Sequence, residues 1–444
     1  MTGFYKKIFF TKRFFIAFGA VIAVFAFSFV VPWLFPAGQT LLAALVAVTI
    51  TDALLLFGDN KQLRIERKLP SRLSLGDENE ITISIKNSSR LSYAVRIIDE
   101  LPFQLQQRDF SINLEIKPDE TRVVKYQIRP LVRGKYDFGH VNVFLSSFIS
   151  FISRKDIHSL NDSAPVYPSI IQMKKYELSA LPHIMTKEGI KRLRKIGHSY
   201  EFEQIKNYVI GDDSRSINWK ASGRRGDLMV NQYEDERSQQ IYSIIDKSRV
   251  MRMPFNGLTL LDYAINTSLV ISNVVLQKYD KAGLITFSDK IGSVIPADRQ
   301  SNQLHKIMES LYNEQEHYLE ADYELLFHVV RNVVRNRSLL FLYSNFESTY
   351  ALERVLPILR RLNRFHLLVI MFFENDELVE FSNKPCEDLE GIYHQTMARK
   401  FIQEKRQIMN ELGMHGIQSI VSKPDELSIN TINKYLELKS RGLI

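Results

Sequence analysis

Two adjacent acids, Asp212 and Asp213, stand in a polar stretch of the chain. Residues 199–236 read SYEFEQIKNYVIGDDSRSINWKASGRRGDLMVNQYEDE, which is dense in Asp, Arg, Lys, Trp and Gly and poor in long apolar runs. Adjacent carboxylates can bind a divalent cation or hold a nearby arginine. Because they follow a glycine, they can equally form a turn and cap the helix that contains Ile217 and Trp219. The residue types leave both interpretations open.

The same stretch has the composition of a partner-binding surface. Trp219 and Arg215 are residue types that dominate binding energy when they fill pockets on a partner. Charged neighbours can select one partner by complementarity. The competing interpretation is that Trp219 packs beneath the following domain and that Asp213 pairs with Arg215 or caps a helix. The residues predicted to bind a partner are Asp212, Asp213, Arg215, Trp219 and Lys220.

Catalytic motifs are missing from the sequence. The histidines are scattered singly, and there is no His-Glu-x-x-His, Gly-x-Ser-x-Gly or Walker A pattern. The single cysteine, Cys386, has neither a disulfide partner nor a zinc-binding neighbour. We therefore predict no catalytic residues and expect a protein that is not an enzyme. The alternative is a metal-dependent enzyme that uses Asp212, Asp213 or Asp246.

The C-terminal half alternates continuous apolar strands with helical patterns. Strands are expected at 241–246, 282–288, 338–344, 366–373 and 416–422, with helices at 258–277, 304–318, 323–335, 349–362 and 387–412 and one more at the end. Strands that are apolar throughout are typical of a parallel sheet covered on both faces. The pattern predicts an α/β domain with a doubly wound parallel sheet.

The region before it shows short runs of alternating hydrophobicity. Such runs occur at 81–87, 93–99, 111–116, 122–128 and 139–145, separated by turn residues. Several short strands at this spacing favour a small β-sandwich. No site chemistry is visible in it, and we expect a spacer or an interaction module.

The N-terminus carries two long apolar runs, at 14–35 and 37–57. Each is long enough to cross about 30 Å of hydrocarbon as a helix, and Pro32, Pro36 and Gly38 between them allow a tight reversal. The sequence thus predicts a transmembrane hairpin rather than a cleaved signal peptide. Asp52 is the one charge within the spans, and we expect it to reach the headgroups rather than to act as an intramembrane acid.

Flanking cations predict the orientation of this hairpin. They precede the first span and follow the second, and the bend has none; they are Lys6, Lys7, Lys12, Arg13, Lys61, Arg64, Arg67, Lys68 and Arg72. Positive flanks stay on the inside, so both termini should be cytoplasmic and the protein should cross the inner (plasma) membrane twice. The formal charge of +8 suits anionic lipid or nucleic acid. We expect the lipid bilayer as a partner, and no nucleic acid.

Four parts follow from these patterns. They are a transmembrane hairpin at 1–60, a β-sandwich-like domain at 61–168, the polar segment at 169–239 and the α/β domain at 240–444.

The polar segment also resembles the signature of a bacterial family. The matching residues are Gly211-Asp212-Asp213-Ser214-Arg215-Ser216-Ile217-Asn218-Trp219-Lys220-Ala221, then Arg224, Leu228-Met229-Val230 and Tyr233-Glu234-Asp235-Glu236. This is similar to the domain-of-unknown-function family fifty-eight, whose members resemble von Willebrand factor A domains. The similarity extends over roughly residues 165–444. The chain departs from the family at Lys206-Asn207, where Arg-Glu is usual, and at Asn231, where an arginine is common.

The resemblance implies a metal site, which this chain retains only in part. A von Willebrand factor A domain binds Mg²⁺ through Asp-x-Ser-x-Ser after its first strand and through a threonine and an aspartate from later loops. Asp246 and Ser248 match the first motif, but Val250 carries no side-chain oxygen. Asn345 stands at the later aspartate position, and the threonine position falls near Asp322.

Two cations, Lys247 and Arg249, add positive charge beside that motif, which opposes cation binding. We therefore expect a degenerate site, no functional Mg²⁺ and no other cofactor. Asp246 can instead end its strand and cap the following segment.

The family also implies a partner. Related proteins are thought to act with a MoxR-type AAA+ ATPase in chaperone-like assembly or envelope stress, together with other von Willebrand factor A-like membrane proteins. The expected function is a membrane-anchored cytoplasmic interaction or scaffold protein.

Overall fold

The computed structural model describes residues 7–58, 63–107, 110–169, 171, 173, 201–209, 212, 214–234, 238–346, 348–374, 376–383 and 389–444. These residues form two compact units, Met1–Tyr167 and Pro168–Ile444. Each unit is described by itself.

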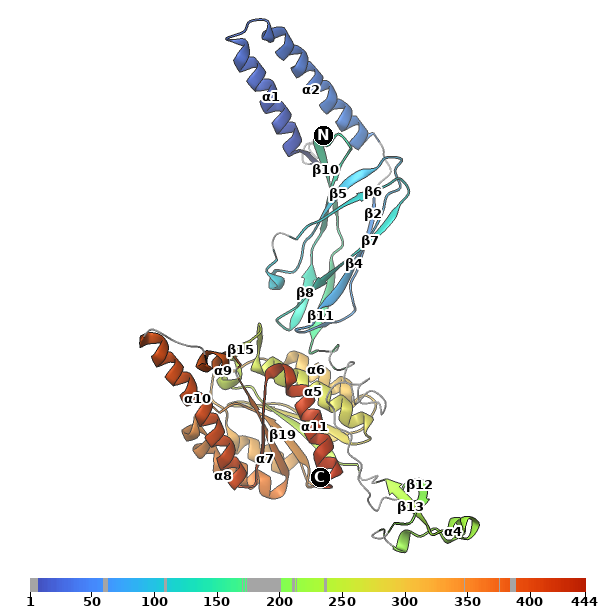
Figure 1. Ribbon diagram of the computed structural model, residues 1–444, viewed down its shortest axis with the longest axis vertical. Coiled ribbons are helices and arrows are strands. Elements are labelled where there is room, and N and C mark those ends of the chain that lie inside the picture. The colour runs from blue at the N-terminus through green and yellow to red at the C-terminus, as the bar shows by residue number, and fades with distance from the viewer. Residues whose placement is uncertain are drawn as a thin grey trace. The chain divides into compact units, whose positions relative to one another are not determined.

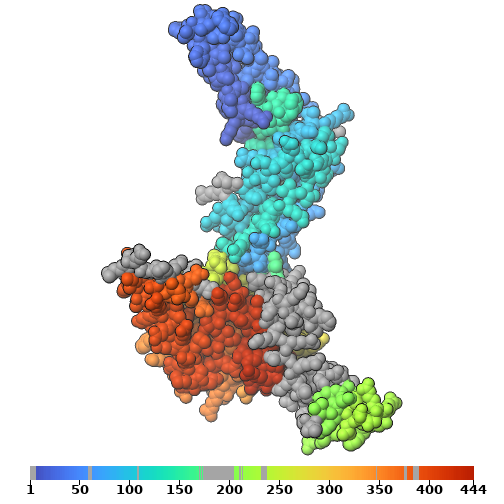
Figure 2. Space-filling view, viewed as in Figure 1, coloured from blue at the N-terminus to red at the C-terminus, as the bar shows by residue number. Residues whose placement is uncertain are grey.

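The N-terminal unit begins with a short strand and two helices that pack against each other (Figure 1). They are β1 (Ile8–Phe10), α1 (Lys12–Ser28) and α2 (Leu34–Phe57). By length and composition, α2 is the one helix in the described ranges that is long and apolar enough to cross a membrane. The two helices project from the sheets of this unit, and most of their apolar side chains are uncovered (Figure 2).

The first helix is shorter than the predicted span at 14–35. It ends at Ser28, because Pro32 has no N–H to donate to the Ser28 carbonyl in a continuing helix. The reversal lies at 29–33, whereas Pro36 and Gly38, which we expected in the bend, belong to α2. Pro36 is tolerated in the first turn, where backbone N–H groups have no partner within the helix. Gly38 permits close approach of α1, since an added Cβ would lie 3.0 Å from the Phe25 ring.

The Asp52 side chain, which we expected to extend freely to the headgroups, is instead bound within the protein. Its carboxylate is fully buried and binds the loop between two strands, β9 (Val141–Ser146) and β10 (Ile152–His158). The Ser147 hydroxyl donates to Asp52 Oδ1, and the backbone N–H groups of Phe151 and Ile152 donate to Oδ2 at 2.8 Å each. Asp52 therefore fastens α2 to the sheets of this unit.

Three small sheets make up the rest of the unit. Their orders are β1-β10-β9-β5-β6, β2-β4-β7 and β3-β11-β8, and every pairing is antiparallel except that of β3 with β11. The remaining strands are β2 (Arg64–Lys68), β3 (Leu73–Ser74), β4 (Asn79–Lys86), β5 (Tyr93–Asp99), β6 (Ile112–Ile116), β7 (Thr121–Ile128), β8 (Gly134–Phe138) and β11 (Asp162–Tyr167). Buried and exposed residues alternate along β4, as expected of a strand with one covered face. The expected small antiparallel strands are confirmed.

One flanking cation has a structural role that the orientation argument did not foresee. Arg67 is buried in β2, where its guanidinium donates to Asp99 Oδ1 at 2.6 Å. The Tyr126 hydroxyl donates to the other oxygen of Asp99 at 2.5 Å. Arg67 therefore contributes to the interior of the sheets rather than to the charge that faces lipid.

The C-terminal unit holds a six-stranded sheet of order β18-β17-β14-β19-β20-β21. Its strands are β14 (Gln240–Asp246), β17 (Lys281–Phe287), β18 (Ile291–Asp298), β19 (Leu339–Tyr343), β20 (Leu367–Phe373) and β21 (Gln418–Ser422). All neighbours are parallel except β18, which runs antiparallel at one edge. The predicted parallel α/β sheet is confirmed, but β18 was not predicted.

Helices cover both faces of this sheet (Figure 1). One face packs against α7 (Tyr323–Val333), α8 (Thr349–Phe365) and α10 (Leu389–Met414). The other packs against α5 (Leu260–Gln277), which α6 (Gln303–Asn313) and α11 (Leu427–Ser440) contact in turn. Two boundaries differ from expectation: α6 ends before the predicted 318, and a separate helix, α9 (Asp376–Asn383), precedes α10.

A smaller hairpin precedes the sheet in the chain. It pairs β12 (Glu201–Asn207) with β13 (Met229–Glu234), and the short helix α4 (Trp219–Arg225) lies between them. This is the polar segment that the sequence singled out.

Candidate functional site

The carboxyl ends of the parallel strands bring polar residues from distant parts of the chain to one edge of the sheet. β14 ends at Asp246, β19 is followed by Ser344 and Asn345, and β20 is followed by Glu374. This edge is where open α/β sheets usually bind ligands.

Asp246 is enclosed by protein donors at that edge. It is 1% exposed, and it accepts hydrogen bonds from the Ser248 N–H at 2.8 Å, the Ser344 hydroxyl at 2.7 Å and the Tyr323 hydroxyl at 3.4 Å. Burial raises the pKa of Asp246 above its usual range, although these hydrogen bonds act in the opposite direction. Both carboxylate oxygens are therefore occupied by donors of the protein.

Of the residues considered for Mg²⁺, the structure brings Asp246 and Ser248 together. Ser248 is also buried and begins the 3₁₀ helix Arg249–Met251. Asp322 is used elsewhere, since its side chain accepts from the Leu325 N–H at 3.0 Å and caps α7. Within the described ranges, no group of three His, Cys, Asp or Glu side chains could hold a metal ion.

The predicted positive charge of Lys247 is neutralised within the fold. Its ammonium lies 2.6 Å from Glu314 Oε2, and both side chains are buried. Glu314 also accepts from the Thr286 hydroxyl at 2.6 Å and the Ser293 N–H at 3.3 Å. Burial would raise the pKa of Glu314, but the hydrogen bonds from Lys247, Thr286 and Ser293 and the charge of Lys247 outweigh it and hold this pKa below its usual range.

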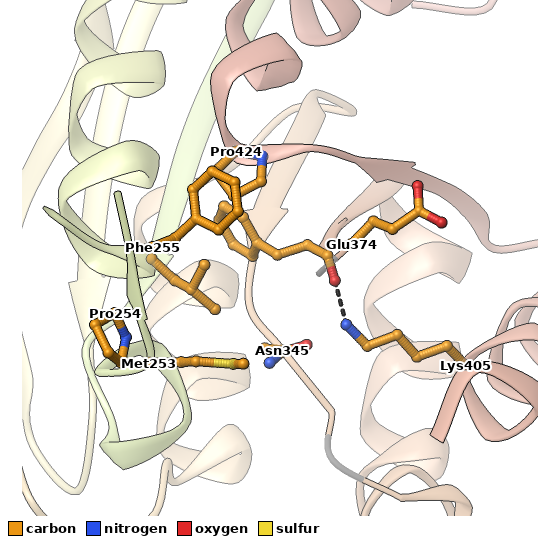
Figure 3. A pocket seen from close by; sticks show the side chains of 9 residues that line it. Met253, Pro254, Phe255, Asn345, Glu374, Lys405 and Pro424 are labelled. Atoms are coloured by element: carbon orange, nitrogen blue, oxygen red, sulfur yellow. Dashed lines mark hydrogen bonds between the residues drawn. The ribbon is translucent and has the colours of Figure 1, made fainter. Parts of the chain in front are cut away.

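A small pocket lies at the same edge, between the β15 segment (Pro254–Phe255) and α10 (Figure 3). Asn345 lines it with a buried Oδ1 that has no hydrogen-bond partner among the described residues. Lys405 reaches in from α10, and its ammonium donates to the Phe373 carbonyl. Burial lowers the pKa of Lys405, and the nearby charge of Glu374 opposes that shift. The cavity of about 10 Å³ has room for roughly one water molecule.

The sequence pattern contains a signal for Lys405, which the predicted functional residues did not include. On α10, the residues at 398, 405, 408 and 412 recur at helical spacing, and Ala398, Ile408 and Leu412 are buried. Lys405 thus lies on an otherwise apolar stripe, where a lysine needs a partner. That partner, the Phe373 carbonyl, could not be found from the pattern.

In the hairpin of β12 and β13, Asp212 stabilises a turn. Its carboxylate accepts from the Lys206 ammonium at 2.9 Å and from the Val209 N–H at 3.0 Å. These two hydrogen bonds lower the pKa of Asp212 below its usual range. Asp213 lies outside the described residues.

The cap of α4 is Asn218, which corrects the idea that the acids cap this helix. Asn218 Oδ1 accepts from the Ala221 N–H at 2.9 Å, and its Nδ2 donates to Asn231 Oδ1 at 2.8 Å. Asn231, one of the departures from the family pattern, therefore pairs across the hairpin.

Trp219 is exposed, so the interpretation that it packs beneath the α/β domain is wrong. It is the first residue of α4, and 73% of its surface is accessible. Arg215 and Lys220 are exposed as well. The described residues of the predicted partner surface thus include an exposed aromatic ring, two exposed cations and the partly buried Asp212.

One family model matches most of the β12–β13 hairpin and much of the sheet. Residues 204–378 match the model described as "Protein of unknown function DUF58". The uncharacterized protein YeaD of Bacillus subtilis (strain 168) is 26% identical over 126 residues, which are 28% of this chain and 31% of YeaD. The chain therefore matches about a third of the length of this relative.

Similarity to solved structures is low. The CARDB domain of the PF1109 protein from Pyrococcus furiosus is 18% identical, with 24% of this chain and 89% of that chain covered and a TM-score of 0.16. Proximal thread matrix protein 1 from the mussel byssus is 10% identical, with 46% of each chain covered and a TM-score of 0.27. Neither likeness carries an argument. Residues 204–378 thus match the DUF58 family, and this chain is a homologue of YeaD.

Proposed function

We propose that this protein is a membrane-anchored cytoplasmic scaffold that acts with a MoxR-type AAA+ ATPase in chaperone-like assembly or envelope stress. The observation that carries the proposal is the exposure of Trp219 beside cations, within the region that matches the family. An exposed tryptophan next to arginine and lysine is suited to anchor an acidic or amphipathic partner surface. Other von Willebrand factor A-like membrane proteins are proposed as further partners.

The proposed anchor is a two-pass hairpin in the bacterial inner membrane with both termini in the cytoplasm. The uncovered apolar surface of α2 supports a lipid environment. The packing of α1 against it supports a return of the chain to the same side. A cytoplasm-active reporter fused after Ile444 should function, and activity of only a periplasm-active reporter there would contradict this orientation.

The C-terminal unit is proposed to be von Willebrand factor A-like in fold but not in metal chemistry. The parallel sheet with one antiparallel edge strand supports the first part. The three donors that occupy Asp246 support the second, because a bound cation would have to displace them. The alternative is a metal-dependent enzyme using Asp212, Asp213 or Asp246. It predicts an activity that requires a divalent cation and that is abolished when one of these acids is replaced by alanine.

Co-purification from native membranes tests the partner. Trp219→Ala should weaken recovery of the ATPase by tenfold or more, which corresponds to about 1.4 kcal/mol. Lys220→Glu should do the same while the protein stays folded. Tyr350→Ala is the matched control, because Tyr350 is an equally exposed aromatic residue (76%) on α8. Full recovery of the ATPase with both the Trp219→Ala and the Lys220→Glu variants would refute the proposed surface.

A further inference from the structure

The loop between β9 and β10 is held by both N-terminal helices. Asp52 of α2 accepts hydrogen bonds from Ser147, Phe151 and Ile152. On the other side, Thr11, which precedes α1, donates through its hydroxyl to the Ser150 carbonyl and through its N–H to the Phe151 carbonyl at 3.0 Å. The loop is thus fixed at the end of the helical hairpin where α1 begins and α2 ends (Figure 1).

A second contact strengthens this attachment. Strand β1, which leads into α1, pairs with β10, with Phe10 opposite Ile152. Arg154 of β10 donates to the Leu56 carbonyl at 3.2 Å, and its guanidinium lies 5.2 Å from the centre of the Phe57 ring. Hydrogen bonds of α2, Thr11 and β1 therefore join the helices to the sheets, in place of a flexible tether.

Apolar side chains are exposed around this attachment. Phe148, at the tip of the loop, is 80% exposed, and Phe9 and Phe10 of β1 and Phe15 of α1 are exposed too. The Phe14 ring contacts the rings of Phe10 and Phe151. Lys12 and Arg13, which lie between Phe10 and Phe14 in the sequence, are exposed. Aromatic rings with neighbouring cations are typical of the boundary between hydrocarbon and headgroups.

The length of the hairpin sets the depth of the loop. Trp33 lies in the turn between the helices, and Asp52 follows it along α2. At a rise of about 1.5 Å per residue, the two are about 28 Å apart along the axis, close to the roughly 30 Å of a hydrocarbon core. When Trp33 occupies one interface, Asp52 and the loop bound to it lie at the other.

We propose that the 147–151 loop and β1 insert into the near interface of the bilayer, so that the β-rich domain is itself a membrane-contact domain. The ligand is the phospholipid surface, with Phe148 among the upper acyl chains and Lys12 and Arg13 at the phosphates. Asp52 supplies the connection that holds the loop at this depth. The inference rests on the proposed anchoring of α2 in the membrane.

Single-tryptophan forms of the full chain, reconstituted in vesicles with brominated acyl chains, test the proposal. The chain has two tryptophans, Trp33 and Trp219. Trp219→Phe alone leaves Trp33, which reports on the anchor. Phe148→Trp with both native tryptophans changed to Phe reports on the loop. Phe103→Trp in the same background is the control, because Phe103 is similarly exposed (85%) in the same domain but away from the loop in sequence.

The expected result is that bromine quenches Trp33 and the Phe148→Trp indole to about half or less, since interfacial side chains lie about 5–10 Å into the boundary, and leaves the Phe103→Trp indole bright. A quenched Trp33 with a bright Phe148→Trp indole overturns this inference and leaves the anchor intact. A bright Trp33 overturns the anchor itself. Asp52→Ala should reduce quenching at position 148 and not at Trp33, and unchanged quenching at 148 would overturn the role of Asp52.

Discussion

Replacing Glu314 by leucine should destabilise the C-terminal unit by about 3–5 kcal/mol, the usual cost of leaving a buried charge without its partner. The Lys247 ammonium has its counter-ion 2.6 Å away, and the side chains of the pair are 7% and 6% exposed. The same substitution leaves the Thr286 hydroxyl without its acceptor, which adds to the cost.

The double substitution Lys247→Met with Glu314→Leu should recover most of this loss. A buried ion pair and an apolar pair of similar volume are often nearly equal in free energy, because the attraction between the charges is offset by their desolvation. The difference between the single and double variants therefore isolates the cost of the unpaired ammonium from the loss of packing.

Hydrogen exchange of the β14 and β17 amides, measured by mass spectrometry on the full chain in detergent, gives the change in opening free energy. Glu316→Leu is the matched control, since its partner Arg252 lies 3.0 Å away in a pair that is partly solvent-exposed and is worth about 1 kcal/mol or less. The reasoning is refuted if Glu314→Leu costs no more than Glu316→Leu, or if the double variant is as unstable as the single one.

The same pair makes the stability of the sheet depend on pH. The folded-state pKa of Glu314 is lowered, so this residue contributes fully to the free energy of unfolding above its unfolded-state pKa of about 4.3. That contribution is lost as the pH falls through the lower folded-state pKa. Protection of β14 in the unmodified protein should thus fall more steeply below about pH 4 than in the double variant. Equal slopes would contradict the assignment.

The sequence predicted the strands of the C-terminal sheet because their signal is local. Strands buried on both faces must be apolar throughout, and the runs at 241–246, 338–344 and 366–373 correspond to β14, β19 and β20. Strand β18 lacked this signal. It lies at an edge, is half-exposed and contains Pro296, which is tolerated only where a ladder hydrogen bond is not needed.

The polar residues of the site were predicted less well because their partners are distant in the chain. Asp246 and Ser248 were found from a motif, but Ser344, which binds Asp246, is 98 residues away. Asp52 shows the same limit, since its contacts lie 95 to 100 residues further on. Residue type and spacing revealed that an acid was unusual at that position, and only the pairing of β9 with β10 determined which donors surround it.

Three further predictions concern Mg²⁺ binding, the exposure of Trp219 and the space around two glycines. The full chain should bind Mg²⁺ no tighter than about 1 mM by titration calorimetry, and micromolar binding abolished by Asp246→Ala would refute the degenerate site. Trp219→Ala should change the free energy of unfolding by about 0.5 kcal/mol or less, since the ring is exposed, and a cost of several kcal/mol would show that the ring is buried. Gly283→Ala and Gly413→Ala should have opposite signs in the same hydrogen-exchange assay. A Cβ on Gly283 would lie 2.5 Å from the Tyr242 ring and 3.0 Å from the Ala297 nitrogen. The ring cannot move aside without loss of the hydrogen bond that its hydroxyl accepts from the Ala297 N–H at 3.0 Å, so we expect a cost of about 1–3 kcal/mol. A Cβ on Gly413, within α10, meets nothing within 4 Å, and alanine should stabilise the helix by up to about 1 kcal/mol. Destabilisation by both substitutions would mean that the surroundings of α10 are tighter than the structure has them, whereas tolerance of Gly283→Ala would mean that β14 and β17 separate more easily than their buried register implies.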